Sequence, residues 1–90
     1  MSVGNTEVGT YSNKTATATI KNTDGIMLGF YVNSTSSGTI QFYDSATTTT
    51  TTPITGVITP PIGWQILPVA YSNGLYMVIT GTINVTVVWL

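Results

Sequence analysis

GIMLGFYVNSTSSGTIQFYD, residues Gly25–Asp44, is the stretch that decides the fold of this chain. Apolar residues alternate with other residues on both sides of a polar centre, NSTSSG at 33–38, which is typical of two β-strands joined by a turn. The alternation places six residues on one face: Ile26, Leu28, Phe30, Val32, Ile40 and Phe42. A lone hairpin is only marginally stable in water, so this apolar face requires a second sheet to cover it.

The rest of the chain has the pattern of further short strands separated by turn residues. Alternating or apolar runs occur at residues 11–21, 53–60, 64–71, 75–80 and 82–90. Turn pairs such as Asp24-Gly25 and Asn73-Gly74 lie between them, and Gly81 is a turn that joins the last two runs into a second hairpin. Pro68 indicates an edge strand or a bulge, because proline has no N–H for a central strand. No segment of helical length has a 3.6-residue period, so we predict an all-β fold: a compact, jelly-roll-like antiparallel β-sandwich of about seven short strands with no significant helix.

The chain has the length of a single domain. Residues 1–10 are polar and contain glycine, and we expect a flexible or partner-bound arm there, followed by one domain over residues 11–90. The threonine run at 47–52 predicts an exposed loop or an irregular edge strand. Residues 1–20 lack the basic start and apolar block of a secretory signal, and no apolar run approaches membrane-spanning length. We therefore expect no signal peptide and no membrane partner, and a protein that either works in a cytosol or leaves the cell by another route, such as lysis.

Charged residues are scarce, at 6% of the chain, and the formal net charge is −1 with no histidine. Two lysines cannot form the basic patch that nucleic acids or anionic membranes require, so neither is an expected partner. A chain near zero net charge tends to associate. We therefore expect other subunits to cover much of its surface.

The residues that carry most enzyme chemistry are absent or poorly placed. Without cysteine or histidine the chain has no disulfide, no thiolate, no zinc site and no histidine-based catalytic triad. The three carboxylates, Glu7, Asp24 and Asp44, fall in polar settings that would not raise a pKa for acid catalysis. Asp24 and Asp44 with loop carbonyls are an alternative calcium site, although turn formation explains both. We predict no enzymatic activity, no cofactor and no metal.

Several large apolar residues fall on faces that a two-sheet sandwich normally turns to water. Contiguous apolar patches on soluble proteins usually mark interaction sites, so we predict a homo-oligomer that packs through one sheet. Met27 lies on these faces, and the candidate oligomer or partner face contains seven residues: Tyr31, Tyr43, Val57, Tyr76, Val78, Val88 and Leu90. The alternative is a slip of one residue in the face assignment at Gly29 or Pro68, which would exchange the two faces.

Two segments carry a resemblance to a known class of protein. One is GFYVNSTSSGTIQFYDS, at 29–45, and the other is PITGVITPPIGWQILPVAYSNGLYMVITGTINVTVVWL, at 53–90, after the threonine run. Over about two-thirds of its length the chain resembles small virion proteins of tailed bacteriophages, of the capsid decoration or cement type. The resemblance implies a compact β-sandwich on the capsid surface, often a trimer, that binds the major capsid protein or another virion protein. It includes no catalytic residue and does not separate a capsid cement protein from a head-fibre or tail component.

Two other functions stay open from the residues. A carbohydrate- or receptor-binding β-sandwich module of a phage head fibre or tail would use Trp64 and Tyr71 as stacking platforms. Its sugar-binding amides would be Asn33, Gln41 and Asn73. Core packing, however, explains Trp64 and Trp89 without a ligand. A structural module of an adhesin or a surface layer is the third alternative.

Overall fold

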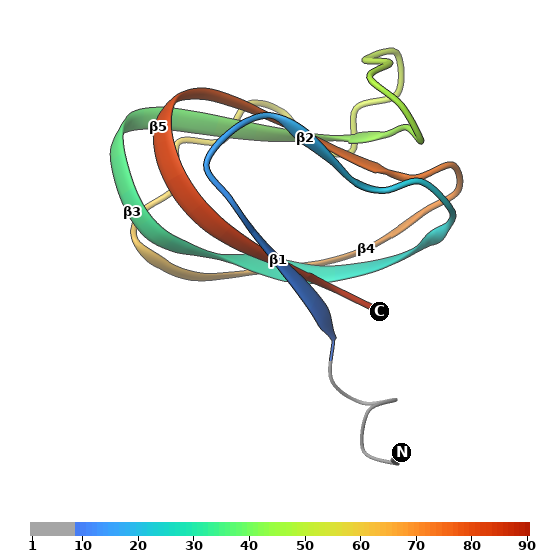
Figure 1. Ribbon diagram of the computed structural model, residues 1–90, viewed down its shortest axis with the longest axis horizontal. Coiled ribbons are helices and arrows are strands. Elements are labelled where there is room, and N and C mark those ends of the chain that lie inside the picture. The colour runs from blue at the N-terminus through green and yellow to red at the C-terminus, as the bar shows by residue number, and fades with distance from the viewer. Residues whose placement is uncertain (1–8) are drawn as a thin grey trace.

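The computed structural model describes residues 9–90, which form one antiparallel sheet of five strands. The strands are β1 Thr10–Lys14, β2 Ala18–Lys21, β3 Gly25–Asp44, β4 Gly63–Tyr71 and β5 Leu75–Trp89. Their order is β1-β5-β3-β4, and β2 also pairs with β5 (Figure 1). The all-β prediction is confirmed for this range, which contains no helix and hence no helix able to cross a membrane. Residues 1–8 of the predicted arm lie outside the described residues, and Thr10 already belongs to β1.

β3 and β5 are long, continuous strands rather than the two hairpins that the sequence predicts. They pair with each other along nearly their whole length, from Met27 opposite Trp89 to Asp44 opposite Leu75. The predicted turn at 33–38 lies within β3, and the second predicted turn, at Gly81, lies within β5. The hairpin prediction is wrong because the polar residues and the glycine mark a bend of two paired strands, not a reversal of the chain.

Both strands bend where Gly81 lies against Ser37. These two residues have positive φ angles, 82° for Gly81 and 56° for Ser37. A Cβ on Gly81 would lie 2.7 Å from the carbonyl oxygen of Ser37, so a larger residue would push the two strands apart. The register of β3 against β5 also shifts twice around this point.

The strand predicted at 11–21 is also interrupted at this bend. The sequence predicts one strand at 11–21, whereas β1 pairs with the second half of β5 and β2 pairs with the first half. Between them, the hydroxyl of Thr17 accepts a hydrogen bond from the backbone N–H of Ile79 (2.9 Å). The break allows this edge of the sheet to follow the bend of β5.

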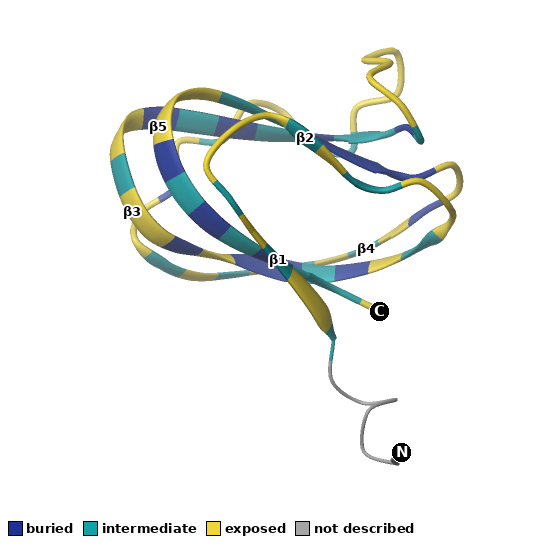
Figure 2. Ribbon diagram, in the orientation of Figure 1, coloured by how far each residue is buried: buried dark blue, intermediate teal, exposed yellow. Residues whose placement is uncertain are grey.

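The bend folds the sheet over so that its two halves face each other across the core (Figures 1 and 2). The β4 half contains β1, β4, the first half of β3 and the second half of β5; the β2 half contains β2 and the other halves of β3 and β5. Phe30 and Phe42 pack together from opposite halves, with ring centroids 5.3 Å apart. The other fully buried large side chains are Met27, Val32, Ile40, Leu75, Met77, Ile83, Val85 and Val87. A two-sheet jelly roll of about seven strands is not confirmed, since one bent sheet forms both layers.

The first part of β3 is shifted by one residue relative to the predicted faces. Met27 is fully buried whereas Ile26 is 44% exposed, the reverse of the prediction. The cause is a β-bulge, because between Met27 and Gly29 the register advances two residues on β3 but only one on β5. Beyond the bulge, Phe30 and Val32 are buried as predicted. The sequence analysis left open a one-residue slip of the face assignment at Gly29, and this slip occurs.

The remaining segments lie at the edges of the sheet. β4 is an edge strand, as Pro68 predicts, and it carries one extra residue opposite the bulge of β3. Residues 47–52 form an exposed loop, as predicted. The predicted strand at 53–60 is reduced to two isolated bridges to β3, one from Pro53 and one from Ile58.

Candidate binding surface

The outer face of the β4 half, turned away from the core, gathers side chains from all four of its strands. Residues directly opposite each other in an antiparallel pair project to the same side, so the register defines rows across the sheet. The Trp64 row contains Asn13, Thr86, Tyr31 and Trp64, from β1, β5, β3 and β4. Beside it, the Ile66 row contains Tyr11, Val88, Gly29 and Ile66.

The Ile66 row and its surroundings expose apolar side chains to solvent. Ile66 is 75% exposed and Tyr11 is 74% exposed. Ile26 and Leu90 extend the exposed area beyond the row, and the backbone N–H of Leu90 donates to the carbonyl oxygen of Ile26 (2.8 Å). None of these side chains is charged, so together they form an apolar patch. At its edge, Nζ of Lys21 donates to the carbonyl oxygen of Leu90 (3.4 Å).

Trp64 lies on the outer face and not in the core, which corrects the prediction for this residue. Its side chain is 44% exposed. A Cβ placed on Gly29 would lie 3.1 Å from Cζ2 of Trp64, so the indole ring covers the bare backbone of Gly29. Trp89, by contrast, is partly buried against the core, as predicted. The glycine therefore creates the space in which Trp64 rests on the sheet.

Three asparagines from three neighbouring strands form a network at the other end of the outer face. Nδ2 of Asn13 donates to Oδ1 of Asn84 (2.8 Å) and to Oγ1 of Thr86 (3.0 Å). Nδ2 of Asn33 donates to the same two oxygens, at 3.1 Å each. Of these three, the sequence analysis proposed only Asn33 as a sugar-binding amide, because Asn13 and Asn84 meet through strand pairing across 71 positions. A signal was present, since asparagine is depleted in strands and each of the three occupies one.

The structure divides the seven residues predicted as a partner face among three places. Three lie on the outer face of the β4 half: Tyr31, Val88 and Leu90. Three lie on the β2 half: Tyr43, Tyr76 and Val78. Tyr76 is only 8% exposed and packs beside Tyr43, with ring centroids 6.0 Å apart. Val57 is exposed in the segment at 53–58, apart from both groups. The sequence analysis missed Ile66 and named Trp64 only as a sugar-stacking platform, because only the register reveals their neighbours across the sheet.

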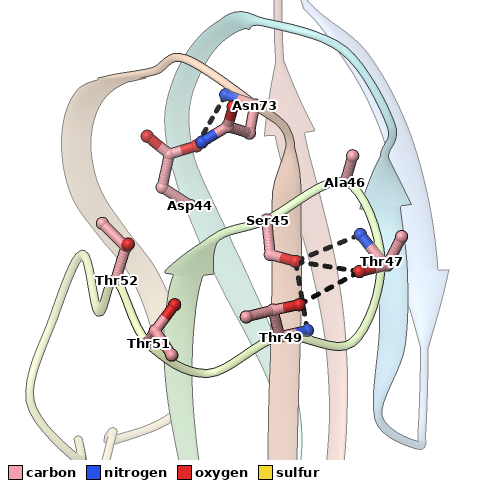
Figure 3. Close-up of a pocket in the computed structure, with 8 residues that line it drawn as sticks. All are labelled: Asp44, Ser45, Ala46, Thr47, Thr49, Thr51, Thr52 and Asn73. Atoms are coloured by element: carbon pink, nitrogen blue, oxygen red, sulfur yellow. Dashed lines mark hydrogen bonds between the residues drawn. The ribbon is translucent and has the colours of Figure 1, made fainter.

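A second candidate is an open polar pocket where the threonine loop meets the turn between β4 and β5, shown in Figure 3. Its volume is about 290 Å³, and its lining residues are Asp44, Ser45, Ala46, Thr47, Thr49, Thr51, Thr52 and Asn73. The hydroxyl of Ser45, which is buried, accepts hydrogen bonds from the N–H groups of Thr47 (3.1 Å) and Thr49 (3.2 Å). These bonds show that Ser45 serves to shape the loop.

The carboxylate of Asp44 is committed to the turn between β4 and β5. It accepts hydrogen bonds from the backbone N–H groups of Ser72 (2.9 Å), Asn73 (2.7 Å) and Gly74 (3.3 Å). The hydrogen bond from Ser72, supported by the other two, lowers the pKa of Asp44 against the opposing effect of burial. Asp44 thus stabilises a turn, and residues 9–90 contain no group of three or more His, Cys, Asp or Glu placed to hold a metal ion.

Tyr71 is not available as a stacking platform, which corrects the prediction. It is 2% exposed, and its hydroxyl has no hydrogen-bond partner among the described residues. Burial raises the pKa of Tyr71, and the negative charge of Asp24 raises it further. Two of the predicted sugar-binding amides also lie elsewhere: Gln41 donates to the carbonyl oxygen of Thr55 (2.9 Å), and Asn73 lines the threonine pocket.

The outer face of the β4 half therefore combines an uncharged apolar patch, two exposed aromatic rings and a fixed set of amides. These properties are the basis of the functional proposal. No protein-family model, curated protein or solved structure matches the chain.

Proposed function

We propose that this chain is a non-enzymatic structural protein that associates with further copies of itself through the apolar patch around the Ile66 row. One observation carries the proposal: the β4 half exposes a contiguous apolar area across its strands. Its most exposed members are Tyr11, Ile26, Ile66 and Leu90. Soluble monomers rarely expose contiguous apolar patches larger than a few hundred Å², because water contact with such a surface is unfavourable.

The charge of the chain favours a second copy as the occupant of this patch. The patch itself has no charged side chain, and Lys21, whose Nζ donates to the carbonyl oxygen of Leu90 (3.4 Å), lies at its edge. Packing two copies together therefore need not remove a charged group from water. A net charge of −1 also gives little repulsion between copies. A partner that binds through charged groups would find no complementary charge on the Ile66 row.

The size of the required interface fits a chain of this size. A standard interface buries roughly 800 Å² per partner, about a sixth of the 4827 Å² surface of the described residues. Tyrosine and tryptophan commonly supply most of the binding energy at the centre of such interfaces. Tyr11, the aromatic residue of the Ile66 row, is 74% exposed and is placed for a second copy to cover it.

The resemblance to virion proteins of tailed bacteriophages supports a location for this association. In the proposal the oligomer, a trimer by that resemblance, sits on the capsid surface and binds the major capsid protein or another virion protein, decorating or stabilising the shell. The bent sheet then serves as the two-layer sandwich that the resemblance implies. A head-fibre or tail position would use the same patch between copies.

Sedimentation of three chains tests the self-association: the wild type, Ile66→Lys, and Val57→Lys as a matched control. We expect the wild type to sediment as an oligomer of the 9.5 kDa chain. Ile66→Lys should sediment as a monomer, because the oligomer would have to bury an unpaired charge. Val57 is 67% exposed outside the patch, so Val57→Lys should keep the wild-type mass. A monomeric wild type at high concentration, or equal effects of both variants, would contradict the proposal.

Electron microscopy of particles assembled with and without the chain tests the virion location. We expect extra density on the capsid surface only when the chain is present. An oligomer that never attaches to particles would refute the virion location and leave the self-association standing.

A further inference from the structure

We propose that the polar end of the same outer face binds a neutral oligosaccharide. The site, which we call the amide–aromatic strip, consists of Asn13, Tyr31, Asn33, Trp64, Asn84 and Thr86. The strip borders the apolar patch, but its hydrogen-bonding groups lie outside it. The inference therefore goes beyond self-association and does not depend on it.

The asparagine network fixes three amides and leaves part of each amide free. Nδ2 of Asn13 and Nδ2 of Asn33 both donate to Asn84 and Thr86, and Nδ2 of Asn13 also donates to the carbonyl oxygen of Val85 (3.3 Å). Among residues 9–90, no partner binds Oδ1 of Asn13, Oδ1 of Asn33 or Nδ2 of Asn84. The strip therefore offers a ligand two amide acceptors and one amide donor group, whose orientations the network already sets.

These groups match the hydroxyls of a sugar. Each sugar hydroxyl both donates and accepts hydrogen bonds, so acceptors and donors placed side by side can bind neighbouring hydroxyls of one ring. The amides are held by one another before any ligand arrives. Binding then orders few additional side chains, which reduces the entropy lost on association.

Two aromatic rings adjoin the network in the same row. Tyr31 lies opposite Thr86 on one side and opposite Trp64 on the other. Both rings are 44% exposed, and Trp64 is supported from below by the backbone of Gly29. Such rings can cover the apolar C–H face of a sugar while the amides bind its hydroxyls.

The composition and length of the strip define the class of ligand. The strip contains no lysine or arginine to pair with the acidic group of a charged glycan, so a neutral glycan fits best. Three strand spacings separate β1 from β4, about 14 Å in all, which suits a short oligosaccharide better than a single sugar. Three asparagines at neighbouring positions oppose strand propensity, and their hydrogen bonds join β1, β5 and β3 on this face.

Titration with four neutral hexasaccharides, built from glucose in β-1,4 linkage, glucose in α-1,4 linkage, mannose and N-acetylglucosamine, tests the inference by calorimetry. We expect saturable binding of at least one, with a dissociation constant below about 1 mM. Asn84→Ala and Trp64→Ala should each weaken binding about tenfold or more, because one removes the shared acceptor of the network and the other a stacking ring. Asn73→Ala, which removes an amide outside the strip, should bind as the wild type does.

Further variants separate this site from the apolar patch and from a folding defect. Trp64→Phe keeps a ring and should retain most of the affinity that Trp64→Ala loses. Asn84→Ala should keep the oligomer mass of the wild type, whereas Ile66→Lys should keep sugar binding while it loses association. Absence of saturable binding of all four sugars up to about 5 mM, or unchanged affinity in both Asn84→Ala and Trp64→Ala, would overturn the carbohydrate site.

Discussion

Gly29 determines which side chains of β3 face the core and which lie outside. The bulge beside it turns Met27 inward and Ile26 outward, and its missing side chain leaves room for the indole of Trp64. The alternation of residues in the sequence could not locate this bulge, because the two-residue pattern of the sequence shows no break where the bulge occurs. The available signal was the glycine itself, since glycine inside a strand often marks a bulge or a close approach.

Gly29→Ala should destabilise the fold by about 2–3 kcal/mol. The new Cβ would clash with the carbonyl oxygen of Gln65, and it would lie 3.1 Å from Cζ2 of Trp64. Urea unfolding followed by tryptophan fluorescence measures the loss. Gly56→Ala is the control, because a Cβ there meets nothing within 4 Å, and its effect should stay within about 0.5 kcal/mol. Equal stability of the two variants would show that β3 and β4 can separate at Gly29 without cost.

Asp44→Asn should lower stability at neutral pH by about 1–2 kcal/mol. The folded pKa of Asp44 is lowered, so its contribution is present above the unfolded pKa of about 3.9 and is lost as the pH falls through the folded value. The difference in unfolding free energy between wild type and variant should therefore shrink between pH 7 and pH 3. A difference that stays constant over this range would mean that the three N–H groups of the turn do not favour the ionised carboxylate.

At the scale of elements, local patterns predicted from the sequence were correct where pairing partners did not matter. The prediction was correct for the inward positions of four residues: Phe30, Val32, Ile40 and Phe42. It was also correct for the edge position of Pro68 and for the exposed threonine loop. The hairpins were wrong because a polar segment with glycine has the same composition in a turn and in a bent strand. Only the pairing of β3 with β5, which are distant in the chain, distinguishes the two.

Gly81→Ala should destabilise the bend of β3 and β5 by about 1–3 kcal/mol. Gly81 has a φ of 82°, and a Cβ there would lie 2.7 Å from the carbonyl oxygen of Ser37. Because the bend joins both halves of the sheet, the two halves should still unfold together. Hydrogen exchange and tryptophan fluorescence should therefore report the same loss. Loss confined to the β2 half would contradict a bend that couples the two halves.

At the scale of the whole molecule, low charge and apolar outer residues in the sequence indicated a binding surface but did not locate it. Tyr31, Val88 and Leu90 were predicted and lie on the outer face of the β4 half, while Tyr76 is covered within the chain. The bend decides this division, because it sends the two ends of β3 into opposite layers. The asparagine network needed the same long-range pairing and so was not predicted.

Association through an uncharged patch should depend little on salt. Screening weakens charged contacts strongly between about 50 mM and 500 mM ionic strength, but it leaves apolar burial unaffected. We expect the dissociation constant of the oligomer to change by less than about threefold over this range, as measured by sedimentation equilibrium. A steep weakening with salt would indicate that charged residues outside the Ile66 row hold the copies together.

Hydroxyl-radical footprinting of the unmodified chain at rising concentration tests the central claim most directly, because it reads side-chain exposure without any substitution. The exposed apolar residues provide both the probes and the control: Tyr11, Ile26 and Ile66 in the apolar patch, and Val57 outside it. The account predicts that oxidation of the first three falls as the chain associates while oxidation of Val57 stays constant. Protection of Val57 with Tyr11 and Ile66 still fully oxidised would contradict it.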